Sequence, residues 1–131
     1  MKTVTALIVL TLTLAACGGT QTAAPTLVDA GAAQELIDTD PELVVLDIRT
    51  PEEVATGTLP AADEFVDFYS PRFQAQIGEL DRDAAYLVYC RSGNRTREAT
   101  RIMSDLGFTD VYELDGGILA WVSNGLPLDQ G

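Results

Sequence analysis

The stretch that decides the fold is residues 85–107, AYLVYCRSGNRTREATRIMSDLG, where an apolar run, a polar loop and a helix-like segment follow one another. The run at residues 85–89 predicts a buried strand. The segment from Asn94 to Leu106 predicts a helix, because its apolar side chains recur at helical spacing and Gly107 supplies a stop. A strand that leads through a loop into a helix is the repeating unit of α/β proteins.

Short apolar runs alternate with helix-like segments over the rest of the chain. The further strands that we predict are residues 27–28, 43–48, 64–68 and 111–114. The further helices that we predict start after Asp29, Thr50 and Ser70 and at the pair Gly116-Gly117. This alternation is typical of βα units around a mainly parallel sheet, so we expect a single α/β domain.

Three helix signals make specific predictions. The segment Thr50-Pro51-Glu52-Glu53 has an N-cap residue, a proline at the first helical position and the glutamate of a capping box, and its helix is expected to end near Gly57. The pair Ser70-Pro71 repeats the start of cap and proline. In the last helix the side chains expected to point inward are Ile118, Trp121 and Val122.

The first residues are typical of an export signal rather than of a folded domain. Lys2 precedes an apolar run from Val4 to Leu14, which is shorter than the roughly 20 residues of a transmembrane helix. The segment Leu14-Ala15-Ala16-Cys17 resembles the lipobox of bacterial lipoproteins. That resemblance implies cleavage before Cys17 and lipidation of Cys17. A plain signal peptide or an uncleaved anchor, with an incidental cysteine, is the alternative.

A flexible tether is expected to follow, because residues 18–26, GGTQTAAPT, have no apolar periodicity. We therefore divide the chain into a signal peptide at residues 1–16, a lipidated Cys17 with its tether at residues 17–25, and one domain at residues 26–131. The expected location is the bacterial cell envelope, on its periplasmic or outer face. The lipid anchor is the only membrane contact that we expect.

The charge balance and the missing histidine exclude several classes of function. Without residues 1–16 the chain has seven basic and twenty acidic residues, a formal charge of −13. A surface this acidic argues against binding to nucleic acid. The absence of histidine excludes Ser-His-Asp and Cys-His catalytic pairs and histidine-ligated metal sites. We expect neither a metal nor a cofactor.

The candidate site is the loop Cys90-Arg91-Ser92-Gly93-Asn94-Arg95, between a strand and a helix. Ligands of open α/β sheets bind at the carboxyl ends of the strands. A short loop there can turn its backbone N–H groups towards one centre, and the helix N-terminus adds partial positive charge. These features, with Arg91 and Arg95, favour a thiolate, so we expect Cys90 to be a nucleophile with a lowered pKa. The alternative is an inert buried cysteine.

Three motifs in order resemble one family. They are residues 46–53, LDIRTPEE, residues 90–96, CRSGNRT, and residues 114–127, LDGGILAWVSNGLP. They closely resemble the segment after the second strand, the active-site loop and the C-terminal signature of the rhodanese family. The resemblance extends from Thr26 to Leu128. It implies a three-layer α/β fold with a central, mainly parallel five-stranded sheet flanked by helices on both faces.

The resemblance also implies a sulfurtransferase, in which a cysteine takes sulfur from a small anionic donor such as thiosulfate. The resulting persulfide passes the sulfur to an acceptor such as cyanide or a thiol. By position, Cys90 is the nucleophile, and its anion cradle consists of Arg91, Ser92, Gly93, Asn94, Arg95 and Thr96. Of these, Arg91 and Arg95 are expected to orient the donor. Asp47 and Arg49 are expected to support the scaffold near the loop.

One stretch departs from the family pattern. Where the family shows Gly-His-Ile-Pro-Gly-Ala, this chain has Gly57-Thr58-Leu59-Pro60-Ala61-Ala62. The histidine that Thr58 replaces is not the base that activates the nucleophile in the family, so we expect the chemistry of Cys90 to survive. The alanine at position 61, in place of glycine, is expected to reshape the turn after Pro60 and with it the pocket.

Two other functions stay open from the sequence. Phosphatases and arsenate reductases of this fold place five residues between the cysteine and the arginine, whereas four separate Cys90 from Arg95, and the shorter loop favours a single sulfur atom over a tetrahedral oxyanion. The other function is a relay or binding module, in which Cys90 takes sulfur or an oxidising equivalent from a membrane-proximal protein partner. A tether would raise the effective concentration of such a partner.

Overall fold

The computed structural model describes residues 23–131, so the predicted signal peptide, Cys17 and most of the tether lie outside the described residues. The elements in chain order are β1 (Thr26–Val28), α1 (Ala30–Thr39), β2 (Val44–Asp47), α2 (Pro51–Val54), β3 (Ala62–Phe65), α3 (Phe73–Gly78), β4 (Tyr86–Tyr89), α4 (Asn94–Asp105), β5 (Val111–Leu114) and α5 (Gly117–Ser123). In this part of the chain no helix combines the length and apolar character needed to cross a membrane.

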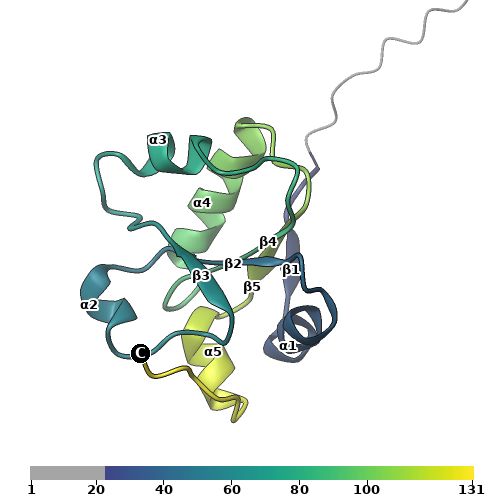
Figure 1. Cartoon of the computed structure of the whole chain (residues 1–131), viewed down its shortest axis with the longest axis vertical. Coiled ribbons are helices and arrows are strands. Elements are labelled where there is room, and N and C mark those ends of the chain that lie inside the picture. Colours follow the sequence, from purple (N-terminus) through teal and green to yellow (C-terminus); the bar gives the residue numbers. More distant parts are fainter. Residues whose placement is uncertain (1–22) are drawn as a thin grey trace, which may run out of the picture.

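The five strands form one sheet in the order β1-β5-β4-β2-β3, and all neighbouring strands are parallel. Helices α3 and α4 cover one face of the sheet, and α1 and α5 cover the other (Figure 1). The predicted α/β fold is thereby confirmed. Strand β4 lies at the centre of the sheet, between β2 and β5, and it leads directly into the candidate loop.

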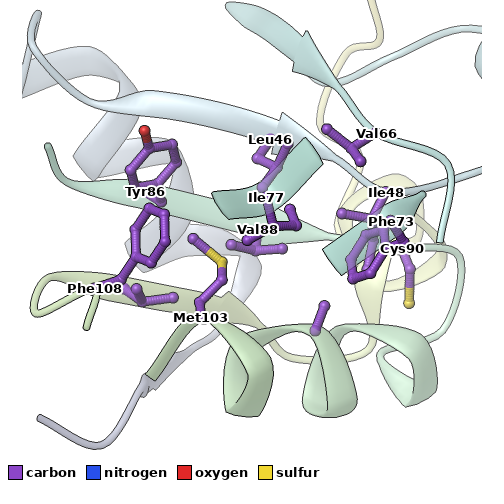
Figure 2. Packing of buried hydrophobic residues seen from close by; sticks show 12 residues of the cluster. Leu46, Ile48, Val66, Phe73, Ile77, Tyr86, Val88, Cys90, Met103 and Phe108 are labelled. Carbon is purple, nitrogen blue, oxygen red and sulfur yellow. The ribbon is translucent and has the colours of Figure 1, made fainter. Parts of the chain in front are cut away.

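Two apolar cores hold the three layers together. The core under α3 and α4 includes Phe73, Ile77 and Met103, packed on the sheet side chains Leu46 and Val88. Figure 2 shows this core, with Cys90 at one end and Tyr86 and Phe108 at the other. The core under α1 and α5 is built around residues that include Ala33, Leu87, Leu114 and Trp121. Strand β4 alternates its side chains between the two, which explains why residues 86–89 are apolar throughout.

Several element boundaries differ from those predicted. Helix α2 ends at Val54, three residues before Gly57, and strand β3 covers Ala62–Phe65 instead of residues 64–68. The later part of that predicted strand still lies along β2, because Val66 N–H donates to Asp47 O and Phe68 N–H to Ile48 O. Register with β2, which shifts between Val45 and Leu46, sets the ends of this edge strand.

Two helix predictions were wrong in detail. Ser70 does not cap α3, because its hydroxyl accepts the N–H of Arg72 and its carbonyl accepts the N–H of Phe73, so the pair Ser70-Pro71 forms a turn before the helix. In α5, Ile118 and Trp121 are buried as predicted, but the side chain of Val122 is 50% exposed. Trp121 also donates its indole N–H to Pro127 O at 2.8 Å, which confirms it as a core residue.

The turn after Pro60 keeps the backbone conformation of a glycine although the residue is alanine. Ala61 has φ +59°, and it is the only residue other than glycine with positive φ among residues 23–131. The left-handed region costs an L-residue about 1–2 kcal/mol, because Cβ approaches the following carbonyl oxygen. Ala61 therefore bears the strain of a conformation that suits glycine.

We expect Ala61→Gly to raise the free energy of unfolding by about 0.5–1 kcal/mol, because the relief of strain exceeds the extra chain entropy of glycine. Urea unfolding of both proteins measures the difference. The matched control is Ala75→Gly, the same chemical change on an exposed position of α3, which should lower the free energy of unfolding by up to about 1 kcal/mol. Equal destabilisation by both changes would contradict the strain at Ala61.

Candidate active site

The candidate nucleophile lies where the central strand β4 ends. Cys90 follows Tyr89 directly, and its side chain is 1% exposed at the end of the apolar core (Figure 2). The neighbouring strand β2 ends at Asp47, in register with Tyr89, so the segment that follows β2 meets the Cys90 loop at the carboxyl edge of the sheet. Parallel register thus brings together the motif at residues 46–53 and the motif at residues 90–96.

The loop after Cys90 turns backbone donors towards the sulfur. Gly93 adopts φ +95°, a left-handed conformation that suits glycine, and its N–H donates to Cys90 Sγ at 3.1 Å. Its carbonyl accepts the N–H of Arg97 at 3.2 Å, the first turn of α4. The loop therefore directs the N-terminus of the 12-residue helix α4 at the sulfur. The partial positive charge of this N-terminus favours a thiolate.

The pKa of the Cys90 thiol lies below its ordinary value, as the sequence predicted. Burial is the strongest single influence and raises the pKa, but the Thr96 hydroxyl and the N–H groups of Thr96, Gly93 and Ser92 together outweigh it. The Thr96 oxygen Oγ1 is itself buried and has no hydrogen-bond partner among the described residues in this geometry. The Thr96 hydroxyl is therefore available to donate a hydrogen bond to an anion at Cys90 Sγ, which favours the thiolate.

Arg95 is bound mainly by Glu53, although its charge also interacts with that of Cys90. Its two terminal nitrogens donate to the two carboxylate oxygens of Glu53, at 2.7 and 2.8 Å, and its guanidinium lies 5.4 Å from the ring centroid of Tyr69. The sequence assigned Arg95 to an anionic donor, but a bidentate carboxylate already neutralises it. Arg95 instead fixes the loop to α2.

Glu53 is the residue near the loop whose full role the sequence did not reveal. The predicted capping box is present, since Glu53 Oε2 accepts the N–H of Thr50 and Thr50 Oγ1 accepts the N–H of Glu53. The same carboxylate also holds Arg95, whose hydrogen bonds are the main reason that the pKa of Glu53 falls to about 2. The sequence signal that could have revealed this contact is the position of Glu53 shortly after β2, because a parallel sheet brings the end of β2 beside the end of β4.

Two arginines close to Cys90 in the sequence, Arg91 and Arg97, are not held by a carboxylate in the described structure. Both are exposed, and neither forms an ion pair within residues 23–131. Arg101, one turn further along α4, pairs with Glu98 and Asp105. Of the two arginines that the sequence predicted to orient an anionic donor, Arg95 is paired with Glu53 and Arg91, which directly follows Cys90, has no ion pair in the described residues.

Asp47 and Arg49 form a buried ion pair behind the loop, with N···O at 2.6 Å and side chains 0% and 3% exposed. Arg49 also donates to the carbonyls of Glu53 and Gly57, which fixes the segment around α2. Asp47 accepts the hydroxyl of Tyr89 at 2.5 Å. Neither residue contacts Cys90 through a hydrogen bond in the described structure, and both lie where a scaffold role requires.

Helix α5 holds the other side of the loop through its backbone. The N–H of Ile118 donates to Cys90 O at 2.9 Å, and the N–H of Leu119 donates to Arg91 O at 3.2 Å. Gly117 has φ +60°, and a Cβ there would lie 2.5 Å from Cys90 O and 2.6 Å from Arg91 O. The pair Gly116-Gly117 is thus required both for the turn into α5 and for this close approach.

We expect Glu53→Gln to lower the free energy of unfolding by about 1–2 kcal/mol at neutral pH, because Arg95 loses its charged partner in a partly exposed site. The folded pKa of about 2 lies below the ordinary 4.5, so this stability is complete above pH 4.5 and is lost as the pH falls towards 2. Urea unfolding over that range should show the two proteins converging. The control Glu52→Gln leaves the pair intact, and a pH-independent difference would contradict the assignment.

We expect Thr96→Val to raise the pKa of the Cys90 thiol, because valine keeps the shape of threonine and removes the hydroxyl. The rate of alkylation by iodoacetamide as a function of pH measures this pKa, with the modified residue identified by peptide mass. The matched control Thr96→Ser keeps the hydroxyl and should titrate like the parent protein. An unchanged pKa in Thr96→Val would show that the backbone donors alone favour the thiolate.

Comparisons with known proteins agree with this geometry. A family model described as the rhodanese-like domain matches residues 29–124. A sulfurtransferase of Allochromatium vinosum is 38% identical over 96 residues, covering 73% of this chain and 86% of the relative. The putative sulfurtransferase YtwF of Bacillus subtilis is 34% identical over 94 residues, covering 72% and 87%.

A solved structure of a rhodanese-related protein from Thermoplasma volcanium superposes with a TM-score of 0.68 at 30% identity, covering 81% of this chain and 99% of that one. The family model spans most of the chain, and its bounds run from the cap of α1 to the end of α5. On these matches and on its five-stranded parallel sheet, the chain belongs to the rhodanese-like family.

Proposed function

We propose that this protein is a sulfurtransferase in which Cys90 carries sulfane sulfur as a persulfide. The observation that carries the proposal is the environment of the thiol: a buried sulfur under the N–H of Gly93, beside a Thr96 hydroxyl that lacks a partner. Two relatives bearing the name sulfurtransferase, at 38% and 34% identity, support the same chemistry. Thiosulfate is the donor that we propose.

In the first step the Cys90 thiolate attacks the outer sulfur of thiosulfate. The new bond joins Cys90 Sγ to that sulfur, the sulfur–sulfur bond of thiosulfate breaks, and its electron pair leaves with sulfite. No proton and no external oxidant are needed, which suits a site without histidine. The exposed Arg91, which follows Cys90 in the chain, is the cation that we propose to meet the anionic donor and the departing sulfite.

In the second step a thiolate acceptor attacks the outer sulfur of the Cys90 persulfide. The bond between the two sulfurs breaks, and Cys90 leaves as a thiolate, which regenerates the starting form. The loop that lowers the pKa of the thiol also makes Cys90 a better leaving group. Between the steps the persulfide anion needs donors, and Thr96 Oγ1 with the loop N–H groups supplies them.

Phosphate-ester hydrolysis fits this site less well. A cysteine phosphatase needs a free arginine in the cradle, because the transferred group is a doubly charged oxyanion. Here both terminal nitrogens of Arg95 bind Glu53. Together with four residues between Cys90 and Arg95 instead of five, this pairing favours sulfur.

A relay role for the same cysteine is the second candidate. Cys90 would then receive sulfur from, or deliver it to, a protein partner near the membrane. The supporting observation is the sequence before the domain, where Leu14-Ala15-Ala16-Cys17 and the polar segment after it favour a lipid anchor and a tether at the cell envelope. Lipidation of Cys17 is part of this proposal and does not affect the chemistry of Cys90.

We expect incubation with thiosulfate to add one sulfur atom to Cys90, detected by intact mass and located by peptide mass. Subsequent addition of cyanide should remove that sulfur as thiocyanate. The amount of thiocyanate is compared with the amount of sulfite released in the first step. The control Cys90→Ser should give neither product, because the serine hydroxyl is not ionised at neutral pH. A protein that gains no sulfur from thiosulfate or from polysulfide would refute the proposed function.

A further inference from the structure

A hollow of about 530 Å³ lies between α2 and the connection from β3 to α3, at the β3 edge of the sheet (Figure 1). Its volume falls within the about 300–1,000 Å³ that is typical of sites for organic ligands. Neither Cys90 nor any other residue of its loop lines this hollow. It is therefore a candidate binding site that is separate from the site of sulfur transfer.

Apolar groups form one side of the hollow. Pro51 and Val54 contribute from α2, and Phe65 contributes from the end of β3. Phe65 is 47% exposed, so its ring is accessible to a ligand in the hollow. An accessible aromatic ring binds apolar groups, and its negative face also attracts cations.

The charged side chains in this wall leave a carboxylate without a cationic partner. Asp67 lines the hollow, and its Oδ1 atom accepts the N–H of Tyr69 at 2.9 Å. Among the described residues, Asp67 forms no ion pair. Arg49 is the basic residue that lines the hollow, and its guanidinium is already held by Asp47. The charge that this wall offers to a ligand is consequently negative.

The side chain of Gln76 adds a hydrogen-bond acceptor without a partner. Gln76 lines the hollow, and its Oε1 atom is buried and accepts no hydrogen bond within residues 23–131. An unpaired buried acceptor destabilises a folded protein, and a donor that reaches it removes this cost. The last torsion of a glutamine side chain is broad, so the amide can turn its oxygen towards a donor in the hollow at low cost.

We propose that this hollow binds a small organic amine in its ammonium form, with an apolar body attached. The ammonium group pairs with Asp67 and donates to Gln76 Oε1, and the apolar body packs against Val54 and Phe65. A carboxylate, an unpaired carbonyl and an accessible ring are together complementary to an ammonium ion and unfavourable to an anion. The excess of acidic residues in the chain also attracts cations from a distance.

The test uses the full chain and three probes with the same apolar body: benzylammonium, benzyltrimethylammonium and benzyl alcohol. Titrations followed by the backbone amide NMR signals give the dissociation constants and locate the contact. We expect the signals of Val54, Phe65 and Gln76 to move. Benzylammonium should bind about fivefold to tenfold more tightly than benzyl alcohol, because only the cation gains the contacts with the carboxylate and the ring.

A pair of matched substitutions tests the charge. Asp67→Asn keeps the shape of the side chain and an oxygen for the N–H of Tyr69, and it should weaken the binding of both cations about threefold while leaving benzyl alcohol unchanged. The control Asp63→Asn removes an exposed carboxylate of β3 that does not line the hollow. This control should leave all three dissociation constants unchanged.

The substitution Gln76→Met tests the hydrogen bond. It should weaken the binding of benzylammonium about threefold to tenfold and leave benzyltrimethylammonium unchanged, because the quaternary ion has no N–H to donate. Without a probe, the same variant should unfold at a higher temperature than the parent protein, because methionine keeps the length of glutamine and removes the unpaired oxygen. Thermal unfolding thus also shows that the variant folds.

Several results would overturn the assignment. Equal binding of the three probes would show a hollow that selects only for apolar surface, and equal losses in Asp67→Asn and Asp63→Asn would show unspecific attraction by the net charge. Binding that disappears when Cys90 is blocked with iodoacetamide would place the contact at the sulfur site instead. The inference does not rest on the proposed function, because the probes contain no sulfur and loading of Cys90 is measured separately.

Discussion

The buried ion pair between Asp47 and Arg49 is the constraint on which the carboxyl edge of this sheet depends. Removing two charges from water is costly unless their remaining hydrogen-bonding groups are satisfied, and a buried pair that loses one partner is strongly destabilised. Here Arg49 donates to Asp47 and to the carbonyls of Glu53 and Gly57, and Asp47 accepts the hydroxyl of Tyr89. The pair therefore ties β2, the segment around α2 and β4 into one unit.

This arrangement of β2, α2 and β4 also determines which charged side chains lie near Cys90. Because α2 is fixed beside β4, Glu53 meets Arg95 and neutralises it. The thiol of Cys90 is then surrounded mainly by uncharged donors: the N–H groups of the loop and the hydroxyl of Thr96. Such donors can favour a thiolate, and a persulfide in its place, without binding a doubly charged oxyanion as tightly as a free arginine would. The uncharged donors of the loop and its length both support the proposed sulfur chemistry.

The same backbone contacts that shape the cradle also hold α5 against the loop. Helix α5 can approach the loop closely only because Gly117 has no side chain. In this position the N–H groups of Ile118 and Leu119 donate to the carbonyls of Cys90 and Arg91. In a chain with an excess of acidic residues, Arg91 is the cation closest in sequence to the nucleophile.

The sequence by itself determined the fold class, the five strands, the capping box at Thr50 and the position of Cys90 between strand and helix. Those features depend on periodicity and on residues close together in the chain, which local sequence reports directly. It did not determine the strain at Ala61, the start of α3 or the exposure of Val122, because register and packing between elements set them. Nor could it show that Arg95 is neutralised. Only the parallel pairing of β2 with β4 brings Glu53 to Arg95 across 42 positions, and a charge is available to a ligand only when no closer partner has already taken it.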